Sequence, residues 1–94
     1  MIWESAVIRE DDRSAILKVA RKYHASAVIL FGSSVNREDA EDIDVGVRGI
    51  DPEAFFDLYG ELLLCLSKPV DVVNLDKRSR FAELVENEGI VLDG

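Results

Sequence analysis

The fold is decided by two short segments, VILFGS at residues 28–33 and DIDVGV at residues 42–47. Each contains a run of apolar and β-branched residues of the length expected for a buried strand. If both form strands, Gly32 and Ser33 lie at the end of the first one. The polar residues of the two segments are therefore expected to meet between these strands.

The second segment carries two carboxylates at strand spacing. Side chains at positions i and i+2 of a strand point to the same face, so Asp42 and Asp44 project together while Ile43 faces the other way. Adjacent carboxylates repel each other unless a cation holds them, and Mg²⁺ is commonly held by one or two carboxylates together with substrate phosphates. Asp71, in the apolar stretch at residues 69–73, is a third candidate ligand, because an ionised carboxylate on a buried strand needs a partner or a metal.

The turn at Gly32 and Ser33 is the candidate phosphate site. Backbone N–H groups and a hydroxyl at a strand end can bind phosphate oxygens, and glycine allows close approach without a clash at Cβ. Each motif alone has an ordinary structural explanation: a turn for Gly32-Ser33, a solvated edge for Asp42 and Asp44, and an exposed strand face for Asp71. Their occurrence together and in this order favours a metal and phosphate site.

These residues resemble the minimal nucleotidyltransferases of the polymerase-beta-like superfamily, and the resemblance covers nearly the whole chain. The signature of that family is an apolar strand, Gly-Ser, a spacer, Asp-x-Asp and a later third aspartate. The resemblance implies an α/β (α+β) fold, in which helices pack on a small mixed β-sheet, and a single minimal nucleotidyltransferase domain over residues 1–94. It also implies metal-dependent transfer of AMP to a hydroxyl, with ATP as the substrate and two Mg²⁺ ions as cofactors.

The resemblance also assigns site residues and a partner. The implied catalytic residues, which are also the implied metal ligands, are Asp42, Asp44 and Asp71. The implied nucleotide-binding residues are Gly32, Ser33 and Arg37. Small members of the family are often encoded beside an all-helical HEPN protein and act as the antitoxin of that toxin, so a HEPN-type partner is expected to carry the acceptor hydroxyl. A homodimer is a further option for the assembly.

The loop after Gly32-Ser33 departs from the family pattern. Small members usually continue with an arginine, a second basic residue and a glycine, whereas SVNR follows here at residues 34–37, and Arg37 is the only basic residue of that loop. The spacer before Asp42 carries acidic residues where the negative triphosphate would bind. A second interpretation is therefore a catalytically degenerate module that neutralises or organises its partner by direct contact.

Length and charge bear on other classes of protein. The 94 residues suffice for one domain with a modest core, and the formal net charge of −8 argues against binding nucleic acid through its phosphate backbone. A basic apolar leader and an apolar stretch of bilayer length are both missing, so we expect a cytoplasmic protein that does not enter the membrane. Cys65 is the only cysteine, and its leucine neighbours predict a buried thiol.

Helical patterns occupy the rest of the chain. Asp11 or Asp12 is expected to cap a first helix that runs to about Tyr23. The last helix is expected to turn Leu84 and Val85 inward, and a glycine ends it before a strand at residues 90–92.

The middle helix is unusually apolar. Asp51 is expected to cap it, Pro52 to begin it, and the helix should end near Lys68. Its apolar residues cover more than one stripe, which exceeds what packing on one sheet requires. Two explanations stay open: the domain buries this helix deeply, or a partner covers part of it.

Overall fold

The computed structural model describes residues 8–32, 41–77 and 80–93. Along these residues the elements follow in the order α1 (Glu10–Lys22), β1 (Ala27–Phe31), β2 (Ile43–Arg48), α2 (Pro52–Cys65), β3 (Val70–Asn74), α3 (Arg80–Glu88) and β4 (Ile90–Asp93). The four strands form one sheet in the order β3-β2-β1-β4. Because β1 is antiparallel to β2 and β4 while β2 is parallel to β3, the sheet is mixed, and the predicted α+β class is confirmed.

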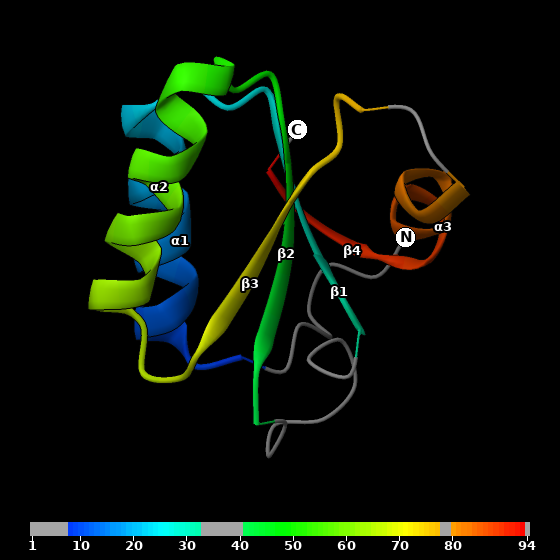
Figure 1. The fold of residues 1–94 in the computed structure, drawn as a ribbon. Helices are drawn as coiled ribbons and strands as arrows, with labels where there is room; N and C mark the ends of the chain where they lie inside the picture. The colour runs from blue at the N-terminus through cyan, green and yellow to red at the C-terminus, as the bar shows by residue number, and fades with distance from the viewer. Residues whose placement is uncertain (1–7, 33–40, 78–79, 94) are drawn as a thin grey trace.

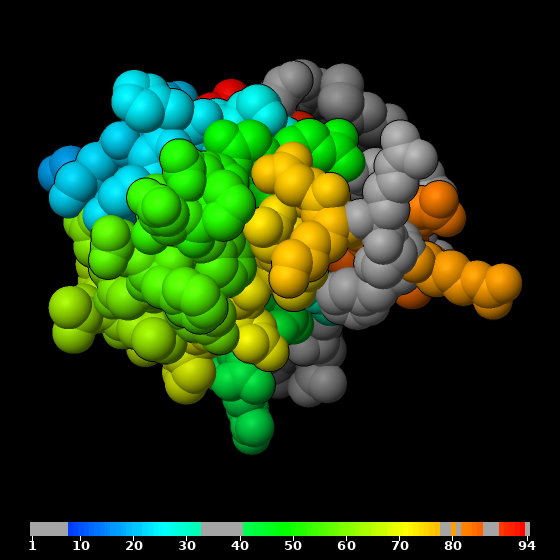
Figure 2. Space-filling view, turned by 45° about the horizontal axis from the view of Figure 1, so that its top comes forward, coloured from blue at the N-terminus to red at the C-terminus, as the bar shows by residue number. Residues whose placement is uncertain are grey.

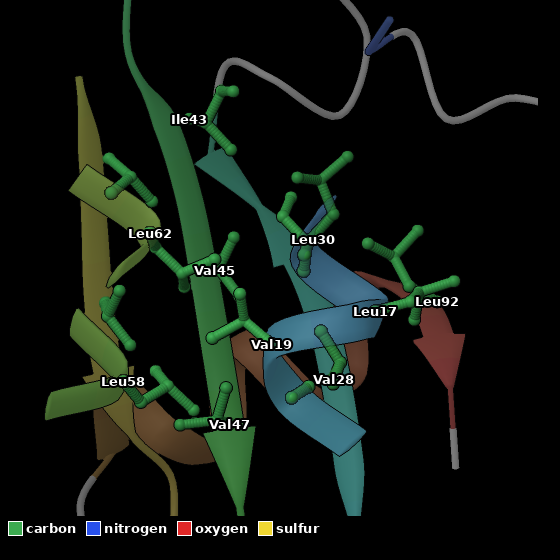
Figure 3. Packing of buried hydrophobic residues seen from close by; sticks show 14 of the residues in the cluster. Leu17, Val19, Val28, Leu30, Ile43, Val45, Val47, Leu58, Leu62 and Leu92 are labelled. Atoms are coloured by element: carbon green, nitrogen blue, oxygen red, sulfur yellow. The ribbon is translucent and has the colours of Figure 1, made fainter. Parts of the chain in front are cut away.

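Helices cover both faces of this sheet. Figure 1 shows α1 and α2 on one face and α3 on the other. The main hydrophobic core fills the space between the sheet and the first two helices, and Ile43, Val45 and Val47 of β2 belong to it. Figure 3 shows Val45 beside Leu62 of α2 and Val47 beside Leu58. Every second residue of β2 is thus buried in this core, which confirms the predicted strand alternation. The residues between them face the side that carries α3.

A smaller cluster lies under α3. It contains Ile29, Leu75, Ala82 and Val85. Val85 points inward as predicted, whereas Leu84 is 51% exposed, because only one stripe of a short helix can reach the sheet. The end of β1 and the starts of β2 and β3 lie together at one end of the sheet (Figure 1). Those predicted site residues that the structure describes, namely Gly32, Asp42, Asp44 and Asp71, lie at this end.

The start of α1 differs from the prediction. Its N-cap is Arg9, which has an extended backbone and makes no capping hydrogen bond with its side chain. Asp12 lies inside the first turn and is only 3% exposed, and its carboxylate accepts hydrogen bonds from Ser67 N at 2.9 Å and from Ser67 Oγ at 2.5 Å. Asp11 forms an ion pair with Arg9 at the surface. Asp12 therefore ties α1 to the loop between α2 and β3, and neither aspartate is the cap.

The predicted start of α2 is confirmed. Asp51 is its N-cap and accepts a backbone hydrogen bond at 2.9 Å, and Pro52 is the first helical residue. The helix ends at Cys65, before the predicted end, and Leu66 is already extended. Pro69 explains part of this early end, because a proline disfavours helical backbone in the residue before it.

One side of α2 is buried and the other side is exposed. Leu58 and Leu62 belong to the main core, whereas Phe56, Leu63 and Leu64 are 77%, 54% and 89% exposed. Figure 2 shows α2, in green, across the front of the molecule. Deep burial of the whole helix within the domain is therefore wrong. The three exposed side chains form a surface that we call the outer face of α2.

The predicted burial of Cys65 is also wrong. This residue is exposed, because it lines an open groove between α1 and α2 and not the core. Partial desolvation raises the pKa of its thiol, which disfavours a reactive thiolate. In the ranges that the structure describes, no helix is long and apolar enough to cross a membrane.

Candidate active site

Two aspartates lie beside each other at the end of the sheet where β2 and β3 begin. Asp44 on β2 is paired with Asp71 on β3 and, on its other side, with Phe31 on β1. Neighbouring strands are about 4.8 Å apart, and paired residues point to the same face. Asp44 is half-buried and Asp71 is exposed, so Asp71 lies on an exposed strand face. The backbone of the sheet thus brings together two of the three predicted aspartates.

Gly32 fits against the carboxylate of Asp44. It follows Phe31 at the end of β1 and has a φ of +70°, a conformation that favours glycine. A Cβ atom built at this position would lie 2.4 Å from Oδ2 of Asp44. Any larger residue would therefore displace the carboxylate of Asp44 or the backbone at the end of β1. Gly32 and Asp44 thus belong to one site.

The carboxylates at this end of the sheet repel one another. Burial raises the pKa of Asp44 most, and the charges of Asp71 and Asp42 raise it further. Asp42 directly precedes β2 and is exposed. Asp42 and Asp71 therefore both lie within electrostatic reach of Asp44, and a cation at Asp44 would relieve this repulsion.

Tyr59 on α2 is a site residue that the sequence analysis missed. Its hydroxyl donates a hydrogen bond to Oδ1 of Asp71 at 2.9 Å. Burial raises the pKa of the Tyr59 hydroxyl, and the hydrogen bond to Asp71 raises it further, so the hydroxyl stays protonated and remains a donor. The helical pattern marked Tyr59 only as one more apolar residue of α2. Its role depends on how α2 crosses the edge strand β3, for which the sequence has no local signal.

The residues of this site suit a divalent cation. Within the described residues, no group of three or more His, Cys, Asp or Glu side chains is arranged to hold a metal ion. Asp71 accepts the hydrogen bond of Tyr59 through Oδ1 only, which leaves its second carboxylate oxygen for a cation. Carboxylate oxygens are nevertheless the ligands that Mg²⁺ prefers, and Asp44 and Asp71 occupy paired strand positions. Burial and the charges of Asp71 and Asp42 raise the pKa of Asp44, and a divalent cation would offset the repulsion between these charges. The residues present therefore fit this ion.

The phosphate side of the site is described only at Gly32. Ser33 and Arg37, the other two predicted nucleotide-binding residues, lie outside the described residues. Their contacts with phosphate stay a prediction. Gly32 lies beside Asp44, so a phosphate bound at this turn would be next to the carboxylates.

Comparisons with known proteins bear on the family and the fold of the chain. The pattern of the family "Polymerase beta, Nucleotidyltransferase" matches residues 14–93. No curated protein matches the sequence. Solved structures do match: a chain of the crystal structure of the toxin–antitoxin MntA–HepT has a TM-score of 0.71 and 26% sequence identity, over 92% of this chain and 73% of that one.

Two further solved structures carry information on ligands and partners. The first is a complex of the tri-AMPylated Shewanella oneidensis HEPN toxin with an MNT antitoxin; the match has a TM-score of 0.69 and 28% identity, over 88% of this chain and 70% of that one. The second is a toxin–antitoxin crystal structure with AMP-PNP, with a TM-score of 0.69 and 27% identity over 87% of this chain and 73% of that one.

The family match includes every residue discussed at the site. It spans Gly32, the three aspartates and Tyr59, and it covers α2 and all four strands in full. The matched structures share this fold over most of the chain. The chain therefore belongs to the polymerase beta nucleotidyltransferase family.

Proposed function

We propose that this chain transfers AMP from Mg-ATP to a hydroxyl group of a HEPN-type partner protein and thereby acts as an antitoxin. The observation that carries the proposal is the pairing of Asp44 with Asp71 across β2 and β3, beside Gly32 and Asp42. Membership of the nucleotidyltransferase family supports the class of reaction. The tri-AMPylated HEPN toxin of a relative supports the choice of acceptor.

The proposed roles are those that the family resemblance assigns, and the positions of Gly32, Asp44 and Asp71 support them. Asp42 and Asp44 would hold two Mg²⁺ ions, and Asp71 would hold one of them. When bound, the ions stabilise charge on the attacking and leaving oxygens of an in-line displacement. Gly32 leaves room for a phosphate close to the backbone, and Ser33 offers its hydroxyl to the same phosphate.

The reaction is one transfer step. The acceptor oxygen attacks the α-phosphorus of ATP, the bond from this phosphorus to the oxygen that links it to the β-phosphate breaks, and pyrophosphate leaves. Asp71, which is exposed and next to Asp44, accepts the proton of the acceptor hydroxyl. Arg37 offsets part of the triphosphate charge from the loop after Gly32.

The outer face of α2 favours a second candidate function, neutralisation of the partner by contact alone. Phe56, Leu63 and Leu64 are exposed there. A groove of about 710 Å³ opens between α1 and α2, with Leu64 beside Lys18 and Lys22 among its lining residues. Exposed apolar side chains rimmed by charged ones are typical of protein interfaces. A partner bound here can be inhibited with or without AMP transfer.

Calorimetric titration with ATP, in the presence and absence of Mg²⁺, tests the enzymatic function. We expect Mg²⁺-dependent binding to the wild type and none to the Asp42→Ala, Asp44→Ala double variant. The matched control is Asp57→Ala with Glu83→Ala, which removes two exposed carboxylates of α2 and α3 and should bind ATP as the wild type does. Absence of Mg²⁺-dependent binding to the wild type, alone and with its partner, would contradict the proposal.

Assays with the toxin separate the two functions. With ATP labelled at the α-phosphate, the wild type and the control variant should label a HEPN-type toxin, and the Asp42→Ala, Asp44→Ala variant should not. Under the enzymatic function this variant still binds the toxin but no longer neutralises it. Full neutralisation by the variant would establish contact as the mechanism.

A further inference from the structure

Tyr59 connects α2 to the carboxylates of the site. Its hydroxyl donates to Oδ1 of Asp71 at 2.9 Å. The tyrosine is partly buried against the main core, and its ring meets that of Phe55 edge to face, with the ring centroids 6.2 Å apart and an angle of 89° between the rings. Asp71, by contrast, is exposed on the edge strand β3. The tyrosine is therefore the firmly held member of this pair.

The hydrogen bond restricts what Asp71 can do. Among the described residues, Tyr59 alone hydrogen-bonds the side chain of Asp71. An exposed aspartate without such a bond samples several rotamers, and ordering it costs entropy each time a ligand binds. Because Tyr59 occupies Oδ1, the second carboxylate oxygen, Oδ2, stays available for another ligand.

We propose that Tyr59 is a positioning residue, which holds Asp71 through Oδ1 and so presents Oδ2 to a divalent cation and to the acceptor hydroxyl. This inference rests on the proposed function, since it takes Asp71 as a metal ligand. Hydrogen-bond partners of metal-ligating carboxylates typically contribute about 10- to 100-fold to metal affinity. Through Tyr59, α2 is part of the catalytic unit as well as of the core.

A simpler role for Tyr59 is to tether α2 to β3, and the chain contains a suitable comparison for it. The hydroxyl of Tyr23 also donates to a carboxylate, that of Glu61, between α1 and α2. Both tyrosines are half-buried. Tyr23→Phe and Tyr59→Phe therefore delete the same group from similar surroundings, but only Tyr59 contacts a proposed metal ligand.

A titration of the full chain with Mn²⁺ alone tests the inference. Electron paramagnetic resonance measures the concentration of free Mn²⁺ at each step. We expect the Kd of Tyr59→Phe for Mn²⁺ to rise about tenfold or more, and that of Tyr23→Phe to stay within about twofold of the wild type. Thermal unfolding in metal-free buffer checks that both variants fold. A Tyr59→Phe variant that binds Mn²⁺ as the wild type does, equal weakening in both variants, or a wild type that binds no Mn²⁺ would overturn the inference.

Measurements of AMP transfer keep this inference separate from the proposed function. A wild type that binds Mn²⁺ through Asp44 but transfers no AMP would refute the proposed function, and the Mn²⁺ comparison of the two tyrosine variants would still decide the role of Tyr59. If transfer does occur, excess Mn²⁺ should restore much of the activity of Tyr59→Phe but none of that of Asp71→Ala. Failure of excess Mn²⁺ to restore Tyr59→Phe would show that the tyrosine does not act through the metal.

Discussion

Asp44 on β2 is paired with Asp71 on the parallel strand β3, and on its other side Asp44 is opposite Phe31 at the end of β1. The chain between the two aspartates includes all of α2, so the pair forms only when the sheet is assembled. Two like charges at this spacing oppose folding in the absence of a cation. We therefore expect the site to lower the stability of the metal-free protein, and the free energy of unfolding measures this effect.

Replacing Asp44 with asparagine should stabilise the metal-free protein at neutral pH. Burial and the charges of Asp71 and Asp42 raise the pKa of Asp44, so the folded state holds this proton more tightly than the unfolded state does. For such a group, the stability falls as the pH rises from the unfolded pKa to the folded one, and it stays lower above both. The free energy of unfolding in urea with EDTA at pH 7 should therefore be higher for Asp44→Asn than for the wild type.

The pH dependence provides the control for this variant. Below pH 3.8, the usual value for aspartate, Asp44 is protonated in both states, and the advantage of Asp44→Asn should vanish. The same variant should lose AMP transfer at every pH. A loss of stability at pH 7, or a gain that does not change with pH, would mean that burial and the neighbouring charges do not destabilise the ionised form of Asp44.

Gly32→Ala should disrupt the site, whereas Gly60→Ala should be harmless. A Cβ at Gly32 would lie 2.4 Å from Oδ2 of Asp44, and the φ of +70° is unfavourable for alanine by about 1 kcal/mol. A Cβ at Gly60 has no neighbour within 4 Å, and alanine should stabilise α2 there by about 0.5–1 kcal/mol. Calorimetric titration with Mg-ATP should show lost binding for Gly32→Ala and unchanged binding for Gly60→Ala. Normal binding by Gly32→Ala would contradict the close fit.

Asp12→Ala should destabilise the fold, in contrast to Asp11→Ala. Asp12 is buried and accepts two hydrogen bonds from Ser67, so its loss leaves the backbone N–H and the hydroxyl of Ser67 without this acceptor, at a cost of about 2 kcal/mol. Both aspartates lie in the first turn of α1, so each variant loses a similar interaction with the helix dipole. The free energy of unfolding should fall for Asp12→Ala and change little for Asp11→Ala. Equal losses would assign the effect to the helix dipole alone.

Much of the fold could be predicted because its signals are local. The alternation around Ile43 and Val45 follows from strand geometry, and Asp51 and Pro52 mark a helix start through their own backbone preferences. The start of α1 was predicted incorrectly because a tertiary contact with Ser67 engages Asp12. The exposure of Cys65 and Leu84 was also missed, since composition does not tell which side of a helix meets the sheet.

The site was predictable only in part, for a similar reason. Gly32, Asp42 and Asp44 lie at strand ends that hydrophobic runs reveal, and Asp71 interrupts such a run. The register that sets Asp44 beside Asp71, by contrast, is fixed by the whole sheet. Tyr59 depends in addition on how α2 crosses β3. Motifs thus identified the proposed catalytic residues, and the fold was needed to find Tyr59, the proposed positioning residue.

Leu64→Gln should weaken binding of a HEPN-type toxin without affecting the fold. Leu64 is more exposed than Phe56 and Leu63, the other two residues of the outer face of α2, and it lines the groove between α1 and α2. An exposed leucine contributes little to the stability of the free chain, so the free energy of unfolding should change by less than about 0.5 kcal/mol. If the partner buries this side chain, affinity measured by calorimetry should fall about tenfold.

The matched control for this prediction is Leu84→Gln. Leu84 is an exposed leucine of α3, on the other face of the sheet from Leu64. Its substitution removes the same apolar group and should leave toxin binding unchanged. If Leu84→Gln weakens binding while Leu64→Gln does not, the toxin docks on the α3 side, the face that also carries Asp44 and Asp71, and the outer face of α2 must be explained by another contact.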